Sequence, residues 1–280
     1  MDFRVDRLAT LYLVSPLMPL AGVGRPSIPI LMYHSISDEA EPEMHPYFRT
    51  STSPSALAAQ LEHLHKSGYQ TRSLPQAVAQ LKLDSGNSAK SVVITFDDGY
   101  SDFREKAFPL LNQFGFGATV FLPTAYIGDG PLKFNGRNCL TWSEVRELQR
   151  YGISFGSHTV THPQLSRLNK NALETEIVDS KNIIEEKTGC GVDSFAYPYA
   201  FPQTNREFKG MLRESLSSAG YVNGVCTMVG KAGSRSESLF LERLPVNSCD
   251  DLAFFQAKLA GAYDWIGSLQ SASKALHAWF

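Results

Sequence analysis

The chain has 280 residues, of which 43% are hydrophobic and 19% are charged, and its formal net charge is −2. This composition is ordinary for a globular protein with a sizeable core. The near-neutral charge, without a basic cluster, argues against nucleic acid as a partner. The four cysteines form no C-x-x-C pair, so neither a zinc finger nor a small disulfide scaffold is expected.

Residues 1–27 form an N-terminal apolar segment. Positions 8–24 carry no charge, but the run is short for a spanning helix of about 20 residues and contains two prolines. The arginines before it are offset by aspartates, and no A-x-A cleavage site follows. We therefore expect a retained segment that lies on a membrane or on the domain itself. This expectation favours a cytoplasmic or membrane-associated protein over a secreted or periplasmic one.

Short apolar runs then alternate with amphipathic helical patterns. Strands are predicted at 28–33, 69–73, 91–96, 118–122, 153–156, 194–197, 221–227 and 239–246. Helices are predicted at 54–67, 75–83, 102–114, 142–151, 170–187 and 206–219 and from 250 onward, and Ser53 and Thr141 are expected as N-caps. Loops are expected at 37–50 and at 123–139, and the second is long enough to cover a site.

This alternation predicts a parallel α/β sheet. About seven strand–helix units favour a closed barrel over a doubly wound sheet. No internal repeat or flexible linker interrupts the pattern, so one domain at 28–260 is predicted. An apolar tail at 261–280 follows it.

The stretch SVVITFDDGYSD at 91–102 is the centre of the pattern. A β-branched and aromatic run leads directly into Asp97, Asp98 and Gly99, at the strand end where parallel α/β folds carry their chemistry. Successive residues of a strand point to opposite faces, so the two aspartates are expected to serve different tasks. Taken alone, the D-D-G sequence is equally consistent with an ordinary turn.

Other predicted strands also end in polar or aromatic residues. His34 follows the first strand, His158 and His162 follow the fifth, and Pro198-Tyr199 follows the sixth. On a helical turn, a spacing of four residues would place both imidazoles on one side. Two histidines and a carboxylate make a common open site for a divalent metal. An isolated H-x-x-x-H is more often a surface feature, but its combination with the aspartates favours the metal site.

The motifs TFDDGY, SHTVTH and FAYPYA, in this order, resemble those of polysaccharide deacetylases of the NodB-homology type (carbohydrate esterase family 4). The opening ILMYHSI resembles the branch of biofilm poly-N-acetylglucosamine deacetylases, whose motif order is circularly permuted. The resemblance covers about residues 28–246. It implies a single distorted (β/α)7 barrel and the metal-dependent removal of acetyl groups from a sugar.

The resemblance assigns Asp98, His158 and His162 as ligands of a divalent metal ion. Zinc is the expected ion for a His-His-Asp set, and nickel, cobalt and manganese remain open. With only three protein ligands, such an ion keeps positions for water and for the substrate carbonyl.

The resemblance also assigns the reacting groups. Asp97 is implied as the catalytic base and His34 as the catalytic acid, since a leaving amine must be protonated. The backbone N–H of Tyr199 is implied as an oxyanion donor, and Pro198 and Tyr199 as substrate contacts. Without the family resemblance, a core histidine would be the simpler interpretation of His34.

The sequence departs from the family pattern in the third motif. Ala196 stands where an arginine usually tethers the base, and Ala200 stands where glycine is usual. Arg243, in LERLPV, is a candidate for orienting Asp97, although a surface charge explains it equally well. No late motif of leucine followed by histidine is present, so the acid role depends on His34 alone.

Three other functions are compatible with parts of this pattern. A glycosidase needs carboxylates that face each other across a bond at about 5 Å or more, which two adjacent aspartates cannot do. A hydrolase of small or cyclic amides stays open, whereas a non-catalytic carbohydrate-binding relative would be expected to lose part of the Asp-Asp-His-His set. The expected partner is an N-acetylated oligo- or polysaccharide or a lipid-linked sugar.

Overall fold

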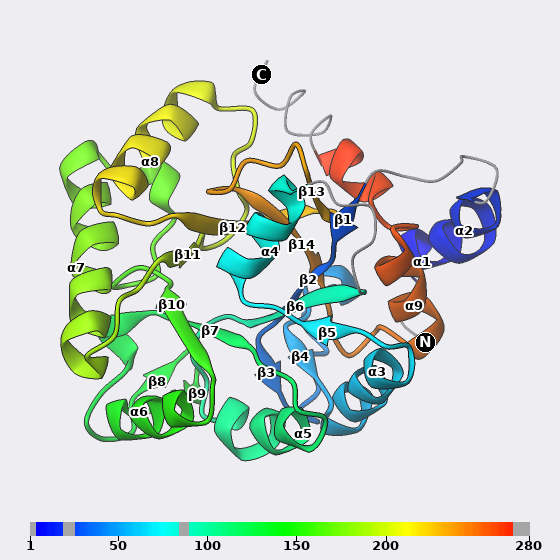
Figure 1. The fold of residues 1–280 in the computed structure, drawn as a ribbon, viewed down its shortest axis with the longest axis horizontal. Helices are drawn as coiled ribbons and strands as arrows, with labels where there is room; N and C mark the ends of the chain where they lie inside the picture. Colours follow the sequence, from blue (N-terminus) through cyan, green and yellow to red (C-terminus); the bar gives the residue numbers. More distant parts are fainter. Residues whose placement is uncertain (1–3, 19–25, 84–89, 271–280) are drawn as a thin grey trace.

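The computed structural model describes residues 4–18, 26–83 and 90–270. Its centre is a ring of seven parallel strands in the order β2-β14-β12-β11-β10-β7-β6, and pairing of β2 with β6 closes the ring (Figure 1). The strands are β2 (Ile30–Tyr33), β6 (Ser91–Phe96), β7 (Thr119–Leu122), β10 (Ser154–Ser157), β11 (Ser194–Ala196), β12 (Asn223–Val229) and β14 (Leu241–Pro245). The predicted closed (β/α)7 barrel is therefore confirmed.

Two predicted strands differ from the expectation. The strand expected at 69–73 is the two-residue β5 (Gln70–Thr71), which pairs with β6 outside the ring. The strand expected at 28–33 is divided into β1 (Ser27–Ile28) and β2 by Pro29, which lacks a backbone N–H. β1 pairs with β13 (Ala232–Gly233). The exclusion of β5 explains why eight predicted runs give seven barrel strands.

Helices surround the ring, as Figure 1 shows. They are α3 (Pro54–Lys66), α5 (Phe108–Gln113), α6 (Trp142–Arg150), α7 (Lys170–Thr188), α8 (Arg206–Ser218) and α9 (Leu252–Ala260), whereas α4 (Leu74–Lys82) covers one end of the ring. A π-helical turn, η4 (Phe103–Ala107), precedes α5. Ser53 and Thr141 cap α3 and α6 as predicted, because each side chain accepts a backbone N–H of the first turn.

The connections between these elements contain short ordered pieces. β3 (Ser35–Ile36) pairs with β4 (Ser51–Thr52), and β8 (Lys133–Phe134) pairs with β9 (Arg137–Asn138) as a hairpin. Single 3₁₀ turns occur at η3 (Pro46–Phe48), η5 (Thr124–Tyr126) and η6 (Leu165–Arg167). The predicted loop 123–139 thus carries a turn and a hairpin of its own.

The buried side chains form two main layers. An inner cluster, which includes Ile30, Val93 and Leu241, fills the barrel together with α4, which lies over one end of the ring (Figure 1). An outer cluster, which includes Val92 and Ile94, packs between the strands and the surrounding helices. The alternation along β6 therefore directs odd-numbered residues to the barrel interior, and Asp97 continues that series at its mouth.

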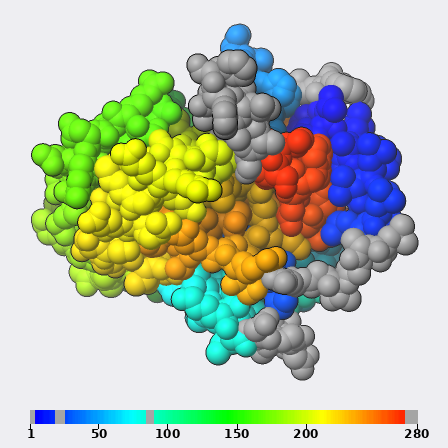
Figure 2. All heavy atoms as spheres, turned by 90° about the horizontal axis from the view of Figure 1, so that it is seen from above, coloured from blue at the N-terminus to red at the C-terminus, as the bar shows by residue number. Residues whose placement is uncertain are grey.

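The N-terminal residues pack on the barrel. α1 (Val5–Ala9), η1 (Thr10–Val14) and α2 (Ser15–Leu17) follow one another, and η1 contacts α9. Figure 2 shows these residues, in blue, beside the last described residues, in red. Buried Arg4 contacts Asp250 and the Tyr263 hydroxyl, and Trp265 donates to the Thr10 hydroxyl. Among the described residues, no helix is both long and apolar enough to span a bilayer. The rest of the predicted end segments, at 1–3, 19–25 and 271–280, lies outside the described residues.

Candidate active site

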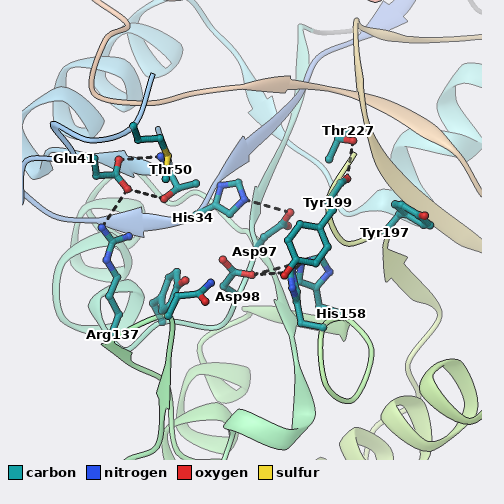
Figure 3. A pocket seen from close by; sticks show the side chains of 14 residues that line it. His34, Glu41, Thr50, Asp97, Asp98, Arg137, His158, Tyr197, Tyr199 and Thr227 are labelled. Carbon is teal, nitrogen blue, oxygen red and sulfur yellow. Dashed lines mark hydrogen bonds and ion pairs between the residues drawn. The ribbon is translucent and has the colours of Figure 1, made fainter. Parts of the chain in front are cut away.

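A cleft of about 400 Å³ opens at the ends of the strands that the sequence singles out (Figure 3). Its walls are formed by His34, Glu41, Met44, Thr50, Asp97, Asp98, Tyr100, Asn135, Arg137, His158, His162, Tyr197, Tyr199 and Thr227. The carboxyl ends of β2, β6, β10 and β11 meet here because the ring is parallel. The barrel thus brings together residues that are up to about 190 positions apart in the chain.

Asp98, His158 and His162 form one cluster in the cleft. One ligand atom of each residue lies within 4.8 Å of the others, and all three side chains are buried. The Nε2 atoms of the two histidines are 3.2 Å apart and lie 3.6 and 3.4 Å from Asp98 Oδ1. Asp98 Oδ1 accepts no hydrogen bond from any described residue. This convergence of two imidazole nitrogens and a carboxylate oxygen fits a divalent cation.

The tautomer of His158 and the lowered pKa of His162 support the same fit. His158 Nδ1 lies 2.8 Å from the carbonyl of Ala196, which requires Nδ1–H and directs the Nε2 lone pair to the cluster. Burial, with the nearby His158, lowers the pKa of His162 to about 3. The His162 imidazole is therefore neutral at pH 7, as a metal ligand must be.

The predicted helical turn at the two histidines is wrong. Residues 158–162 form an irregular loop after β10, in which Thr159 and His162 have φ angles of 70° and 56°. The Glu176 carboxylate of α7 accepts the N–H groups of Val160 and Thr161 at 2.8 and 2.9 Å and holds this loop. The imidazoles converge because the loop folds back on itself, and not because of a helical period.

Unusual backbone geometry also gathers at the cleft. Five non-glycine residues of the described chain have positive φ, namely Asp98, Asn135, Thr159, His162 and Tyr199, and all except Thr159 line the cleft. Such conformations are uncommon for L-residues and tend to persist at functional sites. Gly99 follows with φ 60°, and an added Cβ would lie 2.8 Å from Leu122 Cδ2. The D-D-G turn is thus part of the site, which the sequence alone could not decide.

Asp97 is held by Arg243. The guanidinium donates to both carboxylate oxygens at 2.7 Å, to Thr95 Oγ1 at 3.2 Å and to the Cys226 carbonyl at 3.1 Å. Burial by itself would raise the pKa of Asp97, but the charge and hydrogen bonds of Arg243, with His158, outweigh it and hold this pKa well below its usual range. Arg243 is 1% exposed, so the interpretation as a surface charge is wrong.

His34 follows β2 and faces Asp97 across the cleft, as Figure 3 shows. Its Nε2 lies 4.0 Å from Asp97 Oδ2, and its side chain is 21% exposed. It is therefore a wall residue of the cleft and not a core histidine. The two residues to which the family resemblance gives the acid and base roles face each other.

Tyr199 stands at the mouth of the cleft. Its side chain is half exposed, and its ring centroid lies 4.7 Å from that of His162. Among the described residues, none accepts a hydrogen bond from its backbone N–H, which leaves a free donor at the site. Pro198 is buried and is not one of the residues that line the cleft.

One wall was not predicted. Arg137, on β9, donates to Ser51 Oγ at 2.7 Å and to Glu41 Oε1 at 3.3 Å, and this joins the 133–138 hairpin to the 37–50 loop. Asn135 lies at the hairpin tip with φ 48°. The Asn135-Gly136 pair between two short runs is a hairpin signal, so the sequence could have predicted the hairpin that forms this wall. Of the aromatic residues near the site, Trp142 is in the core, and the ring centroid of Phe134 lies 4.9 Å from that of His162.

Comparisons with known proteins agree with these motifs. The family model for polysaccharide deacetylase matches residues 84–223. The protein YxkH of Bacillus subtilis (strain 168), named for a polysaccharide deacetylase, is 32% identical over 221 residues, which is 79% of this chain and 71% of that protein. The poly-β-1,6-N-acetyl-D-glucosamine N-deacetylase of Escherichia coli (strain K12) is 33% identical over 46% of this chain, but the match spans only 20% of that protein.

Solved structures agree with the fold. The Streptococcus pyogenes deacetylase PplD superimposes with a TM-score of 0.72 at 26% identity, over 85% of this chain and 99% of that one. IcaB from Ammonifex degensii has the same fold, with a TM-score of 0.67 at 21% identity over 85% and 97% of the two chains. The motifs, the closed seven-stranded barrel and these matches lead to one conclusion: the chain belongs to the polysaccharide deacetylase family and is a hydrolase of that class.

Proposed function

We propose that this protein removes acetyl groups from N-acetylated sugar units of a polysaccharide or glycan precursor, in a metal-dependent hydrolysis. The observation that carries the proposal is the convergence of His34, Asp97 and the cluster of Asp98, His158 and His162 in one cleft. The names of two relatives, both poly-β-1,6-N-acetyl-D-glucosamine N-deacetylases, support an N-acetylated sugar as the substrate class.

Asp98, His158 and His162 would hold the ion. Zinc suits two imidazoles and a carboxylate, and nickel, cobalt or manganese would suit them too. When bound, such an ion supplies a Lewis acid that polarises a carbonyl and lowers the pKa of water. The unpartnered Asp98 Oδ1 and the tautomer fixed at His158 support this assignment.

Asp97 is the proposed base. Because Arg243 keeps its pKa low, the carboxylate stays ionised throughout the neutral range and can always accept a proton. The same low pKa makes it a weak base, so it serves best by orienting a water molecule that is already acidified. Arg243 fixes the position of both oxygens, which keeps the acceptor preorganised.

His34 and Tyr199 complete the proposed chemistry. His34 lies at the cleft wall opposite the cluster and is the proposed donor of the proton that a leaving amine needs. The free backbone N–H of Tyr199 would donate to the oxygen on which negative charge develops. Pro198, which precedes it, would act by shaping the loop.

The test is acetate release from N-acetylglucosamine oligomers. Metal-loaded protein should release acetate, and chelated protein, Asp97→Asn and His34→Ala should each lose most of that activity. If a protein that binds one divalent ion tightly releases no acetate from any N-acetyl sugar, this function is wrong. A hydrolase of small or cyclic amides would then be the second candidate, and oligomer binding without turnover would indicate a carbohydrate-binding relative.

We also propose that the N-terminal helices contact a membrane surface, with residues 28–260 as the catalytic domain of a cytoplasmic or membrane-associated protein. The side chains of Val5, Tyr12, Leu13 and Leu17 are more than 60% exposed, whereas polar Arg4 and Thr10 face the barrel. A helical segment with apolar side chains on its outer face suits a position at a membrane–water interface. Tyr12→Ser/Leu13→Ser should reduce co-sedimentation with anionic phospholipid vesicles. Unchanged binding, or no binding by the wild-type protein, would exclude the contact.

A further inference from the structure

Tyr199 has a backbone conformation that tyrosine disfavours. Its φ angle is 58°, in the left-handed region, and its side chain is 54% exposed. A non-glycine residue keeps such a conformation only when its surroundings over-determine it. The packing of the tyrosine side chain cannot be the whole reason, because about half of it faces solvent. The holding contacts must therefore act on the backbone of residues 198–200.

The loop is anchored on both sides of this position. Tyr197 N donates to the Val225 carbonyl at 2.9 Å and so extends the pairing of β11 with β12. Phe201 is fully buried, and its ring centroid lies 4.9 Å from that of Tyr197 and 5.2 Å from that of Phe240. Residues 198–200 form an arch between these two anchors.

One hydroxyl ties this arch to the barrel. Thr227 Oγ1, on β12, accepts the backbone N–H of Phe201 at 2.9 Å and donates to the carbonyl of Tyr199 at 2.9 Å. A threonine hydroxyl has one donor hydrogen, so its donor is fully used here. The second bond fixes the plane of the peptide that follows Tyr199, and Figure 3 shows Thr227 beside this residue.

We propose that Thr227 is a positioning residue that locks residues 198–200 so that the Tyr199 N–H is preorganised as the oxyanion donor. This inference rests on the proposed function, in which that N–H stabilises the developing charge. Thr227 lines the same cleft, but its hydroxyl is engaged by the Phe201 N–H and the Tyr199 carbonyl, so it acts through Tyr199. Without the hydroxyl, both backbone bonds are lost and the disfavoured conformation can relax. The donor would then have to be reoriented during the reaction, which removes the advantage of preorganisation.

The variants are Thr227→Val, which keeps the shape and removes the hydroxyl, and Thr227→Ser, which keeps the hydroxyl. Thr71→Val is the matched control, because Thr71 Oγ1 also accepts a backbone N–H, that of Gly117, but lies outside the cleft. Loss of one oxyanion donor typically reduces kcat about 100-fold. We expect Thr227→Val to approach this loss with KM and metal affinity little changed. Thr227→Ser should restore kcat, and Thr71→Val should leave it unaltered.

Two substrates separate this inference from the proposed function. 4-Nitrophenyl acetate needs the oxyanion donor, but its leaving group needs no proton. Thr227→Val should therefore slow both this ester and N-acetylglucosamine oligomers, whereas His34→Ala should slow mainly the oligomers. If the wild-type protein cleaves only the ester, the proposed substrate is wrong and the ester still tests Thr227. A Thr227→Val enzyme with wild-type kcat on both substrates would overturn the inference.

A structural measurement decides the matter independently of turnover. Crystal structures of the metal-loaded wild-type protein and of Thr227→Val should differ at residues 198–200, with Tyr199 released from positive φ in the variant. If the arch is unchanged in Thr227→Val, the hydroxyl does not hold it and the inference fails. If Thr227→Val does not fold, Thr227→Ala and Thr227→Ser provide the same comparison.

Discussion

Arg243 and Asp97 form a bidentate ion pair inside the barrel from strands that are not neighbours. β14 and β6 flank β2 in the ring, so the guanidinium crosses the interior behind β2 to reach both carboxylate oxygens at 2.7 Å. Ala196, where the family resemblance leads one to expect the tethering arginine, belongs to the inner cluster. Its small side chain leaves the barrel centre free, so the same ion pair can be made from β14.

Arg243→Met should reduce kcat by at least about 100-fold and lower the free energy of unfolding by about 3–5 kcal/mol, because it leaves a buried carboxylate without its partner. The pKa of Asp97 should rise, since burial then acts unopposed by the guanidinium. Acetate-release assays measure the change in kcat, and denaturant unfolding measures the change in the free energy of unfolding. Ala196→Arg/Arg243→Ala should recover part of both losses. Wild-type activity in Arg243→Met would show that the tether is dispensable.

The acidic limb of kcat/KM should report the metal-ligand histidines and not Asp97. Asp97 remains ionised well below neutral pH because its pKa is held low. Protons compete with the cation for its ligands, so the limb should move to lower pH as the free metal concentration is raised. Profiles at several buffered metal concentrations measure this shift. If the acidic limb stays at the same pH at every metal concentration, it reports the titration of a catalytic group and not competition with the metal.

The metal-free protein should lose stability in acid because of His162. Burial lowers the pKa of this residue from 6.5 to about 3, so below pH 6.5 the unfolded state binds a proton that the folded state does not. The free energy of unfolding should fall by up to about 1.4 kcal/mol per pH unit between pH 6.5 and 3. Chelated wild-type protein and His162→Gln, unfolded in urea across this range, measure the difference. Parallel pH dependences would contradict the assignment.

Arg4 should matter for stability and Arg7 should not. Arg4 is buried against Asp250 and Tyr263, whereas Arg7 makes a solvent-exposed pair with Asp251. Arg4→Met should lower the free energy of unfolding by about 3 kcal/mol, because it breaks a buried ion pair. The matched control Arg7→Met should cost less than about 1 kcal/mol. Equal effects in urea unfolding would show that the N-terminal helix is not held by its buried arginine.

Arg137 should affect substrate binding more than turnover. It joins Glu41 and Ser51 at the cleft wall, and no contact links it to Asp97 or to the cluster of Asp98, His158 and His162. Arg137→Ala should therefore raise KM for N-acetylglucosamine oligomers about tenfold with kcat within about threefold, since it removes binding common to ground and transition states. Steady-state kinetics separate the two parameters. A change in kcat alone would instead place this wall in the chemistry.

Much of the fold follows from local sequence. The run that becomes β6, the caps at Ser53 and Thr141 and the alternation of strands with helices depend on neighbouring residues, and they were predicted with the right type and order. The motif residues could also be placed at strand ends, since a parallel barrel brings those ends together. Local propensity and hydrophobic period carry this information within a window of a few residues.

Only the tertiary structure decided the rest. Arg243 and Asp97 are 146 positions apart, so no local pattern distinguishes a buried tether from a surface charge. The two histidines converge because the loop between them contains residues with positive φ and is held by Glu176 of α7. The four-residue spacing of the histidines does not reveal this loop conformation. The ion pair joins two strands that come together only when the ring closes, and the loop depends on a carboxylate of the helix that follows it. The sequence by itself thus determined which groups are present at the strand ends, and closure of the barrel decided how they are held and which of them face each other.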